Sequence, residues 1–182
     1  LKKKKGFSFT GNIGRLQRIP LLVKAIKEYI KKGGSLEFEF AGGGILKNQI
    51  FDLSKNISLI KYHGLVTSEQ AGSISSTYEW ALAPIEDEVT PYAFPSKISS
   101  YVYSGAKILA ICNNETSVAK WVKTNRVGIV VKPNVDTIVD IFFKIEKNEI
   151  NTDFIDLDRN ELKKSLHIDQ FVKNIKSKIS AL

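Results

Sequence analysis

The residues best suited to chemistry lie between positions 90 and 105, where a long loop passes into a predicted helix. Pro95 fits the first helical turn, because its missing N–H would be unpaired there, and Gly105 fits the left-handed residue that ends a helix. A helix N-terminus presents free N–H groups and a positive dipole end, which suits an anionic ligand. Lys97 adds a cation at this junction. The segment therefore predicts a phosphate-binding site.

A second candidate for phosphate binding, residues 11–18, follows the first predicted strand. Gly11 and Gly14 allow the backbone to approach a ligand closely, and Arg15 and Arg18 offer guanidinium donors to phosphate oxygens. The segment lacks the third glycine of the dinucleotide fingerprint and the Gly-Lys-Ser/Thr of a P-loop. Taken alone, it is explained equally well as a structural strand-to-helix turn.

The other reactive side chains have no partners at useful spacing. His63 and His167 lack a second metal ligand, so structural roles are expected for both. Cys112 lacks the Cys/His pairing of a catalytic nucleophile, and we expect it to pack in the core. The acidic run at 86–88 could bind sugar hydroxyls or form a solvated loop. No self-contained acid–base set is present, and no obligatory metal is expected.

The elements that would position these residues alternate between short apolar strands and amphipathic helices. Strands are predicted at residues 7–10, 36–41, 57–62, 78–85, 106–111 and 127–131. Helices are predicted at 16–32, 45–55, 68–76, 95–104, 117–123, 135–147 and 160–179. This alternation predicts an α/β fold, a doubly wound, mainly parallel six-stranded sheet with helices on both faces.

Ligands of such sheets bind beyond the carboxyl ends of the strands, at the crevice where the strand order reverses. Each unusual loop of this sequence falls at such an end: residues 11–18, 42–44, 64–66 and 86–97. We therefore expect the four loops to share one ligand.

Composition narrows the class of protein. The chain has 182 residues, of which 43% are hydrophobic, enough for one domain with a substantial core. It has no apolar run that could span a membrane, no visible secretory signal and a single cysteine, so we expect a cytoplasmic protein that could associate peripherally with the inner face of the membrane. Methionine is absent, even at position 1, and we expect a fragment of a longer chain.

The formal net charge is +8, from 27 basic and 19 acidic residues. Such a surplus can attract nucleic acid, anionic lipid or phosphorylated ligands. Most lysines are dispersed through the predicted helices, which favours solvated helix faces, and no aromatic platform is interleaved with clustered arginines, which disfavours a nucleic-acid partner. The lysines at 2–5 are expected in a linker remnant spanning residues 1–5, or in contact with an anionic surface.

Four segments occur in a fixed order that is shared with a known family: GNIGRLQ at 11–17, FAGGG at 40–44, YHGLV at 62–66 and PSKISSYVYSG at 95–105. Together they resemble the C-terminal half of a bacterial group 1 glycosyltransferase, a retaining enzyme with two facing Rossmann-like domains (the GT-B fold). The resemblance covers about residues 6–145. It implies a donor-binding domain over 6–159 and a C-terminal helix over 160–182 that packs toward an N-terminal, acceptor-holding domain.

The resemblance also implies roles for individual residues. The loop at 11–18 and Lys97 would meet the diphosphate of a nucleotide sugar, with Arg15, Arg18 and Lys97 stabilising the charge on the leaving group. The glycines at 42–44, with Leu65 and Val66, would lie along the nucleoside and base. The loop at 89–94 would approach the sugar. The residues implied in donor binding are Gly11, Asn12, Gly14, Gln17, Gly42, Gly43, Gly44, Leu65, Val66, Thr90, Pro91, Tyr92, Ser96 and Ser100.

Two positions depart from the first loop of the family. Many members carry an arginine and a lysine where this sequence has Asn12 and Gln17. The positive charge at this loop would therefore have to come from Arg15 or Arg18.

The family's paired glutamates, eight residues apart, fall on Tyr92 and Ser100. The second glutamate normally binds the ribose hydroxyls. A hydrogen bond to a charged group contributes about 1.5–3 kcal/mol and a neutral one about 1 kcal/mol, so we expect modest donor affinity unless a neighbour such as Glu88 compensates.

We therefore predict the donor-binding domain of a hexosyltransferase that builds bacterial surface polysaccharide, using a polysaccharide or lipid-linked glycan acceptor and requiring its N-terminal domain for full activity. One alternative is half of a nucleotide-sugar 2-epimerase, which needs acidic residues and a histidine in the site. Another is a non-catalytic, flavodoxin-like interaction module, which predicts no nucleotide affinity and no functional need for Lys97.

Overall fold

The computed structural model describes residues 2–90, 96–153, 155 and 159–166. Six strands form one sheet in the order β3-β2-β1-β4-β5-β6, and every neighbouring pair is parallel. The strands are β1 (Lys4–Thr10), β2 (Glu37–Ala41), β3 (Ile60–Tyr62), β4 (Tyr78–Pro84), β5 (Lys107–Ile111) and β6 (Gly128–Val131). The predicted six-stranded parallel sheet is confirmed. Its order reverses between β1 and β4, and sheets of this kind commonly hold their ligands beyond the carboxyl ends of the strands at such a position.

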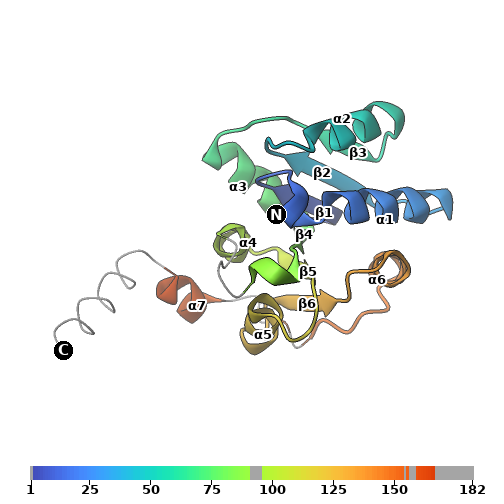
Figure 1. Cartoon of the computed structure of the whole chain (residues 1–182). Coiled ribbons are helices and arrows are strands. Elements are labelled where there is room, and N and C mark those ends of the chain that lie inside the picture. The colour runs from blue at the N-terminus through green and yellow to red at the C-terminus, as the bar shows by residue number, and fades with distance from the viewer. Residues whose placement is uncertain (1, 91–95, 154, 156–158, 167–182) are drawn as a thin grey trace.

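Helices cover both faces of the sheet (Figure 1). The helices are α1 (Ile19–Lys31), α2 (Lys47–Asn56), α3 (Ser68–Thr77), α4 (Lys97–Ser104), α5 (Ser117–Thr124), α6 (Val135–Glu146) and α7 (Asn160–Ser165), with 3-10 turns η1 (Arg15–Gln17) and η2 (Asp87–Val89). One apolar cluster joins α1, α2 and α6 to one face, and a second joins α4 and α5 to the other. None of the described helices is long and apolar enough to cross a membrane.

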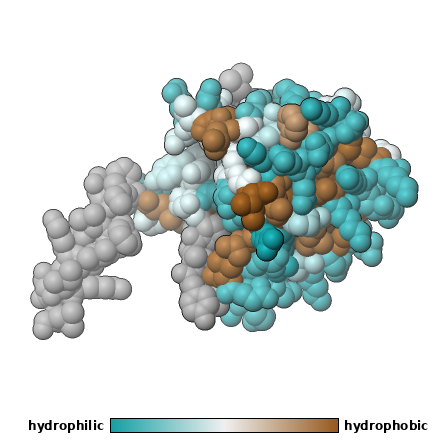
Figure 2. Space-filling model, turned by 45° about the horizontal axis from the view of Figure 1, so that its top comes forward, coloured by the Kyte–Doolittle hydropathy of each residue, from teal (hydrophilic) through white to brown (hydrophobic). Residues whose placement is uncertain are grey.

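The lysines of α1 lie at the surface, as the dispersed charge predicts. Lys24, Lys27 and Lys31 are exposed, while the apolar side chains between them face the sheet. The face shown in Figure 2 is mostly hydrophilic, with patches of apolar side chains between the polar ones. Two of the most exposed large apolar residues, Ile45 at 77% and Leu65 at 85%, follow the carboxyl ends of β2 and β3.

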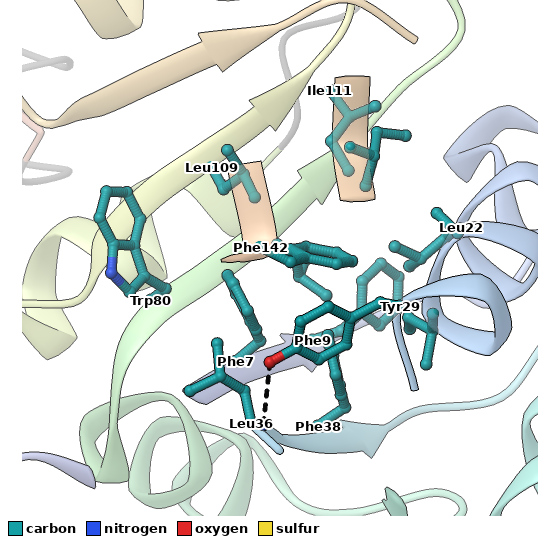
Figure 3. Close-up of a cluster of buried hydrophobic side chains, with 14 of the residues drawn as sticks. Phe7, Phe9, Leu22, Tyr29, Leu36, Phe38, Trp80, Leu109, Ile111 and Phe142 are labelled. Carbon is teal, nitrogen blue, oxygen red and sulfur yellow. Dashed lines mark hydrogen bonds between the residues drawn. The ribbon is translucent and has the colours of Figure 1, made fainter. Parts of the chain in front are cut away.

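The larger core cluster is built around aromatic rings that pack against one another (Figure 3). The Phe7 ring lies 5.1 Å from that of Phe38 on the next strand and 4.8 Å from that of Phe142 on α6. Because helices cover both faces, residues on both sides of the central strands are buried, and these strands appear in the sequence as continuous apolar runs. The predicted strand from residue 57 starts at Ile60, because Ile57 still closes α2 through its N–H bond to the Leu53 carbonyl.

Tyr29 fastens α1, β2 and α6 through one buried hydroxyl. The hydroxyl accepts the N–H groups of Ser35 and Leu36, both at 3.1 Å, and donates to the Glu146 carboxylate at 2.8 Å. Burial raises the pKa of the Tyr29 phenol, so it stays protonated and able to donate. Position 34 accepts only a glycine beside this ring, because a Cβ there would lie 2.2 Å from a ring carbon of Tyr29.

Lys3, Lys4 and Lys5 are part of the fold, which corrects the expected linker at these three positions. β1 already begins at Lys4. The Lys3 ammonium donates to the carbonyls of Ser76 and Ser104 at 2.8 Å each, near the C-terminal ends of α3 and α4. Lys5 donates in the same way to the Glu146 carbonyl, the last residue of α6, at 2.8 Å. Cations are stabilised at helix C-termini, where unpaired carbonyls and the negative dipole end meet.

Arg159 ties the end of the described chain to the sheet. Its guanidinium is buried and donates to the carbonyls of Ala106 at 2.9 Å and Val127 at 3.2 Å. The predicted final helix starts as expected at Asn160, and α7 ends at Ser165; residues 167–182 lie outside the described residues. That this helix packs toward another domain stays a prediction.

We expect Tyr29→Phe to lower the free energy of unfolding by about 2 kcal/mol, because the N–H groups of Ser35 and Leu36 and the Glu146 carboxylate each lose one hydrogen bond, although Ser35 and Glu146 keep the bond between them. Urea denaturation followed by circular dichroism measures this loss. Tyr103→Phe is the matched control, since the exposed Tyr103 hydroxyl makes one bond, to the Lys163 carbonyl. Its cost should stay below about 1 kcal/mol. Equal costs for the two variants would contradict the role given to Tyr29.

Candidate functional site

The loops that follow β1, β2 and β3 are held together by main-chain hydrogen bonds. The N–H of Gly11 donates to the Ala41 carbonyl at 2.9 Å, and the N–H of Ile13 donates to the Gly43 carbonyl at 2.7 Å. The N–H of Gly42 in turn donates to the Gly64 carbonyl at 2.7 Å. Three of the four unusual loops therefore form one continuous edge.

Gly42 makes this close approach possible. Its φ is +135°, a value that L side chains rarely adopt, and a Cβ there would lie 1.8 Å from the Gly11 carbonyl oxygen. Gly44 is under the same constraint, since its Cβ would lie 2.3 Å from the Ile13 carbonyl oxygen. The glycines therefore serve the backbone contact between two strand ends and leave a shallow floor above it.

A cavity of about 930 Å³ lies over this floor. Its walls come from the three loops, from one side of α2 and from the first turn of α3. The lining residues are Gly11, Asn12, Gly42, Gly43, Gly44, Lys47, Asn48, Phe51, Tyr62, Gly64, Leu65, Val66, Thr67, Ser68 and Ala71. Apolar walls with few polar groups are typical of sites for small organic ligands.

A second cavity of about 570 Å³ continues between α3 and α4 and shares Gly11, Ser68 and Ala71 with the first. Hydroxyl groups dominate its wall, including those of the predicted site residues Ser96 and Ser100. Among the described residues, neither cavity is lined by a carboxylate.

Lys97 is the first residue of α4 and lines the second cavity. The residue as a whole is half-buried, but its Nζ is fully buried and has no hydrogen-bond partner among the described residues. The Nζ lies 4.0 Å from the centroid of the Phe9 ring, which offers a cation–π contact. Burial lowers the pKa of the Lys97 ammonium from its ordinary 10.5 to about 7. The structure thus keeps an amine unpaired beside the predicted phosphate position.

Tyr101 is a positioning residue that the sequence analysis missed. Its hydroxyl accepts the Thr10 N–H at 3.1 Å and reaches the Leu82 carbonyl at 3.2 Å, which fixes α4 to the ends of β1 and β4. Burial raises the pKa of this phenol to about 12. The sequence shows only that Tyr101 lies one helical turn after Lys97. This spacing could not reveal which buried groups its hydroxyl binds.

Arg18 is bound by groups of the fold, and its predicted role at the diphosphate stays a prediction. Its guanidinium donates to the Ile85 carbonyl at 2.7 Å and pairs with Glu86 at 2.8 Å and Asp87 at 2.9 Å. The Asp87 carboxylate also accepts the Asn113 N–H at 2.9 Å. The arginine is thus occupied by the fold and lines neither cavity, and two of the three acidic residues at 86–88 form ion pairs instead of a solvated loop or a sugar site.

Of the other residues in the loop at 11–18, some line a cavity and others do not. Asn12 lines the first cavity and donates to the Gln17 side-chain oxygen at 3.2 Å. Gln17 and Gly14 line neither cavity, and Arg15 is exposed outside both. Only Gly11 and Asn12 of this loop therefore face the space where a ligand would lie.

The predicted loop before α4 is described only in part. Thr90 is buried. Its hydroxyl donates to the Asp87 carbonyl at 2.8 Å, and its main-chain carbonyl accepts the Ser117 hydroxyl at 2.7 Å, so both groups stabilise the loop itself. Pro91 and Tyr92 lie outside the described residues. The predicted contacts of the loop at 89–94 with the sugar stay predictions.

His63 takes a local role next to the third loop. Its Nε2 lies 2.7 Å from a carboxylate oxygen of Glu39, across neighbouring strands. Within the described part of the chain, no group of three or more His, Cys, Asp or Glu side chains could hold a metal ion.

We expect Gly42→Ala to destabilise the chain by about 3 kcal/mol, because the new Cβ must push the Gly11 carbonyl away and the backbone angle is strained. Chemical denaturation measures the loss. Gly72→Ala is the control, since Gly72 lies in α3 with open space around it, and alanine is the better helix former. An unchanged midpoint for Gly42→Ala would show that the strand ends are not locked together.

The buried amine predicts a pH-dependent stability. The unfolded chain binds one proton more than the folded chain between pH 7 and pH 10.5, the folded and ordinary pKa values of Lys97. Stability should therefore rise with pH in this window, by up to about 1.4 kcal/mol per pH unit from this group. Lys97→Met should remove that part of the slope, while Lys24→Met, at an exposed position, should keep it. Denaturation at pH 7.5, 8.5 and 9.5 checks this, and parallel curves for all three proteins would contradict it.

Comparison with curated proteins gives a distant relative. No protein-family model matches the chain. The chain is 25% identical over 135 residues to "Probable glycosyltransferase WbjE" of Pseudomonas aeruginosa, a match that covers 73% of this chain and 33% of the relative. The chain thus spans about a third of the length of the curated relative that it matches.

Comparison with solved structures identifies the fold. HepE of Anabaena, in complex with UDP, matches 97% of this chain and 49% of its own, with a TM-score of 0.68 at 12% identity. TarM matches 96% of this chain and 35% of its own, with a TM-score of 0.68 at 13% identity. The catalytic domain of cholesterol-alpha-glucosyltransferase from Helicobacter pylori matches 89% of this chain, with a TM-score of 0.57 at 14% identity. The chain therefore has the fold of one domain of the GT-B glycosyltransferases, as the order of its motifs predicts.

Proposed function

We propose that this chain binds the nucleotide-sugar donor of a retaining hexosyltransferase, which transfers the sugar to a polysaccharide or lipid-linked glycan. The observation that carries the proposal is the pair of adjoining cavities at the carboxyl ends of β1, β2 and β3, with the unpaired Lys97 amine beside their shared wall. An elongated ligand with an uncharged end and an anionic middle fits this arrangement.

The solved relatives support the choice of ligand. HepE of Anabaena has been crystallised with UDP and with UDP-glucose, and TarM of S. aureus with UDP. These proteins share the fold of this chain at 12% identity, so their ligands guide the proposal without fixing the sugar or the base.

The first cavity suits the nucleoside. Its glycine floor lets a flat ring approach the backbone, and Leu65, Val66 and Phe51 supply apolar wall. The predicted roles of Gly42, Gly43, Gly44, Leu65 and Val66 are kept in this proposal. Asn12 and Thr67 offer polar groups at the same wall.

The diphosphate would lie at Gly11, where the two cavities join. Lys97 and the first N–H groups of α4 would face it from one side, and the hydroxyls of Ser68, Ser96 and Ser100 would offer neutral hydrogen bonds. Donors aimed at a leaving diphosphate stabilise the charge that develops as the glycosidic bond breaks. Because Arg18 is paired with carboxylates, Lys97 becomes the main cation at the proposed diphosphate position, while Lys47 lines the first cavity and Arg15 lines neither.

Sugar transfer in this proposal also uses an acceptor-holding domain. The chain matches 33% of the length of WbjE and 49% of that of HepE, so the activity of a whole enzyme is inferred from only part of each relative. The 2-epimerase alternative needs acidic residues and a histidine in the site, and the described residues that line the cavities include neither. The interaction-module alternative differs by predicting no nucleotide affinity.

We expect the chain to bind UDP or GDP, measured by calorimetry or ligand-observed NMR, and to bind the bare nucleosides more weakly. A charge-assisted hydrogen bond contributes about 1.5–3 kcal/mol, so Lys97→Met should weaken the diphosphate about 10- to 100-fold and the nucleoside little. Lys24→Met on the outer face of α1 is the control and should change neither. No binding of any nucleoside diphosphate at millimolar concentration would refute the proposal. Equal losses for diphosphate and nucleoside would refute the contact to Lys97.

A further inference from the structure

The amine of Lys97 is held away from water and from any hydrogen-bond partner among the described residues. Its Nζ is fully buried and unpartnered among the described residues, although it belongs to a half-buried residue at the rim of a cavity. A lysine on such a rim would ordinarily extend into water, where its ammonium is hydrated. Here the side chain turns inward over the Phe9 ring, with Nζ 4.0 Å from its centroid.

The stored amine lies next to the proposed diphosphate position. A Cβ placed on Gly11 would be 3.7 Å from Cε of Lys97 and 3.8 Å from its Nζ, so the lysine packs directly against this glycine. Gly11 lines both cavities. A rotation about the side-chain bonds would carry Nζ from the Phe9 ring toward the junction of the cavities at Gly11.

No described group near Lys97 can hold its proton in the stored position. The elements around it are β1, α3 and α4, and the other ionisable side chain on the second cavity is Tyr103, whose hydroxyl donates to the Lys163 carbonyl. The Tyr101 hydroxyl on α4 is bonded to Thr10 and Leu82. In the first cavity the ionisable groups are Lys47 and Tyr62, and the Tyr62 hydroxyl donates to the Gly42 carbonyl.

An ammonium in this position loses its water and gains only the face of an aromatic ring. Burying a charge without hydrogen-bond partners is unfavourable, and a lysine in such a site responds by releasing its proton. Burial accordingly lowers the pKa of Lys97 to about 7. A diphosphate at Gly11 would raise the pKa of Lys97 again, because a nearby opposite charge favours the charged form.

On the basis of the proposed function, we propose that Lys97 is a proton-coupled phosphate clamp: its uncharged amine is stored over Phe9 in the free chain, and a diphosphate draws it into the cavity junction as an ammonium. The amine takes one proton from water or buffer, no other bond is made or broken, and the new N–H groups donate to the phosphate oxygens. Each diphosphate bound thus takes up about one proton at a pH well above 7, where the free amine is uncharged. Affinity should fall about tenfold per pH unit above pH 7, until the pKa of Lys97 in the complex is reached.

The test is a calorimetric titration of UDP into the chain at pH 8.5, in buffers with different enthalpies of ionisation. The terminal phosphate has a second pKa of about 6, so the diphosphate of UDP is fully ionised at this pH and has no proton to exchange. The observed enthalpy should change with buffer enthalpy with a slope of about one proton taken up for UDP. Uridine should give a slope near zero.

Variants identify the group that takes the proton. Lys97→Arg is permanently charged, so UDP should bind without proton uptake, and Lys97→Met should bind UDP more weakly, also without uptake. Lys24→Met should match the unmodified chain. On the unmodified protein, 13C NMR of the lysine Cε groups should show one resonance that titrates near pH 7 in the free chain and at a higher pH with UDP, which keeps the test independent of how the variants fold.

The outcomes separate the two proposals. UDP binding with no proton uptake, or with uptake that persists in Lys97→Met, overturns the clamp and leaves the proposed function standing. The clamp is also overturned, and the proposed function again stands, if every lysine Cε resonance of the free chain titrates near pH 10. Failure of UDP and GDP to bind at all overturns the proposed function, and the clamp with it.

Discussion

The close contact between the ends of β1 and β2 determines where this molecule can hold a ligand. The Gly11 carbonyl oxygen occupies the space that a side chain on residue 42 would need, so the two strand ends can meet only through a glycine. Main-chain hydrogen bonds then join the loops after β1, β2 and β3 into one edge. Because that edge has almost no side chains of its own, the space above it stays open and its floor is made of peptide groups.

The other side of the crevice is set by polar side chains that link distant parts of the chain. Tyr101 fastens α4 to the ends of β1 and β4, and Arg18 fastens the first loop to the loop after β4 through Glu86 and Asp87. These groups satisfy one another and rigidify the frame. Among the buried side-chain nitrogens and oxygens of the described residues, Lys97 Nζ stands out as the one left without a hydrogen bond. A rigid frame around this one buried and unsatisfied amine of the described residues is an arrangement that an anionic ligand would complete.

The sequence alone was enough to predict the sheet, because apolar runs of strand length alternated with helical patterns and ended in glycines. It also placed the phosphate-facing candidates at strand ends, since parallel strands bring their carboxyl ends to one edge. It could not reveal hydrogen-bond and ion-pair partners that are remote in the chain. Arg18 looked available because Glu86 and Asp87 lie nearly 70 positions away, and Lys3 and Lys5 looked like part of a linker because the helix carbonyls that they bind lie far along the sequence. The inward turn of Lys97 depends on Phe9 and could not be read from local pattern either.

The most direct test of this account is a crystal structure of the chain with UDP bound. The account predicts the base over the glycine floor beside Leu65, the diphosphate at Gly11, and Lys97 Nζ turned away from Phe9 within hydrogen-bond distance of a phosphate oxygen. UDP on another surface, or UDP in the cavities with Lys97 still lying over Phe9, would contradict it.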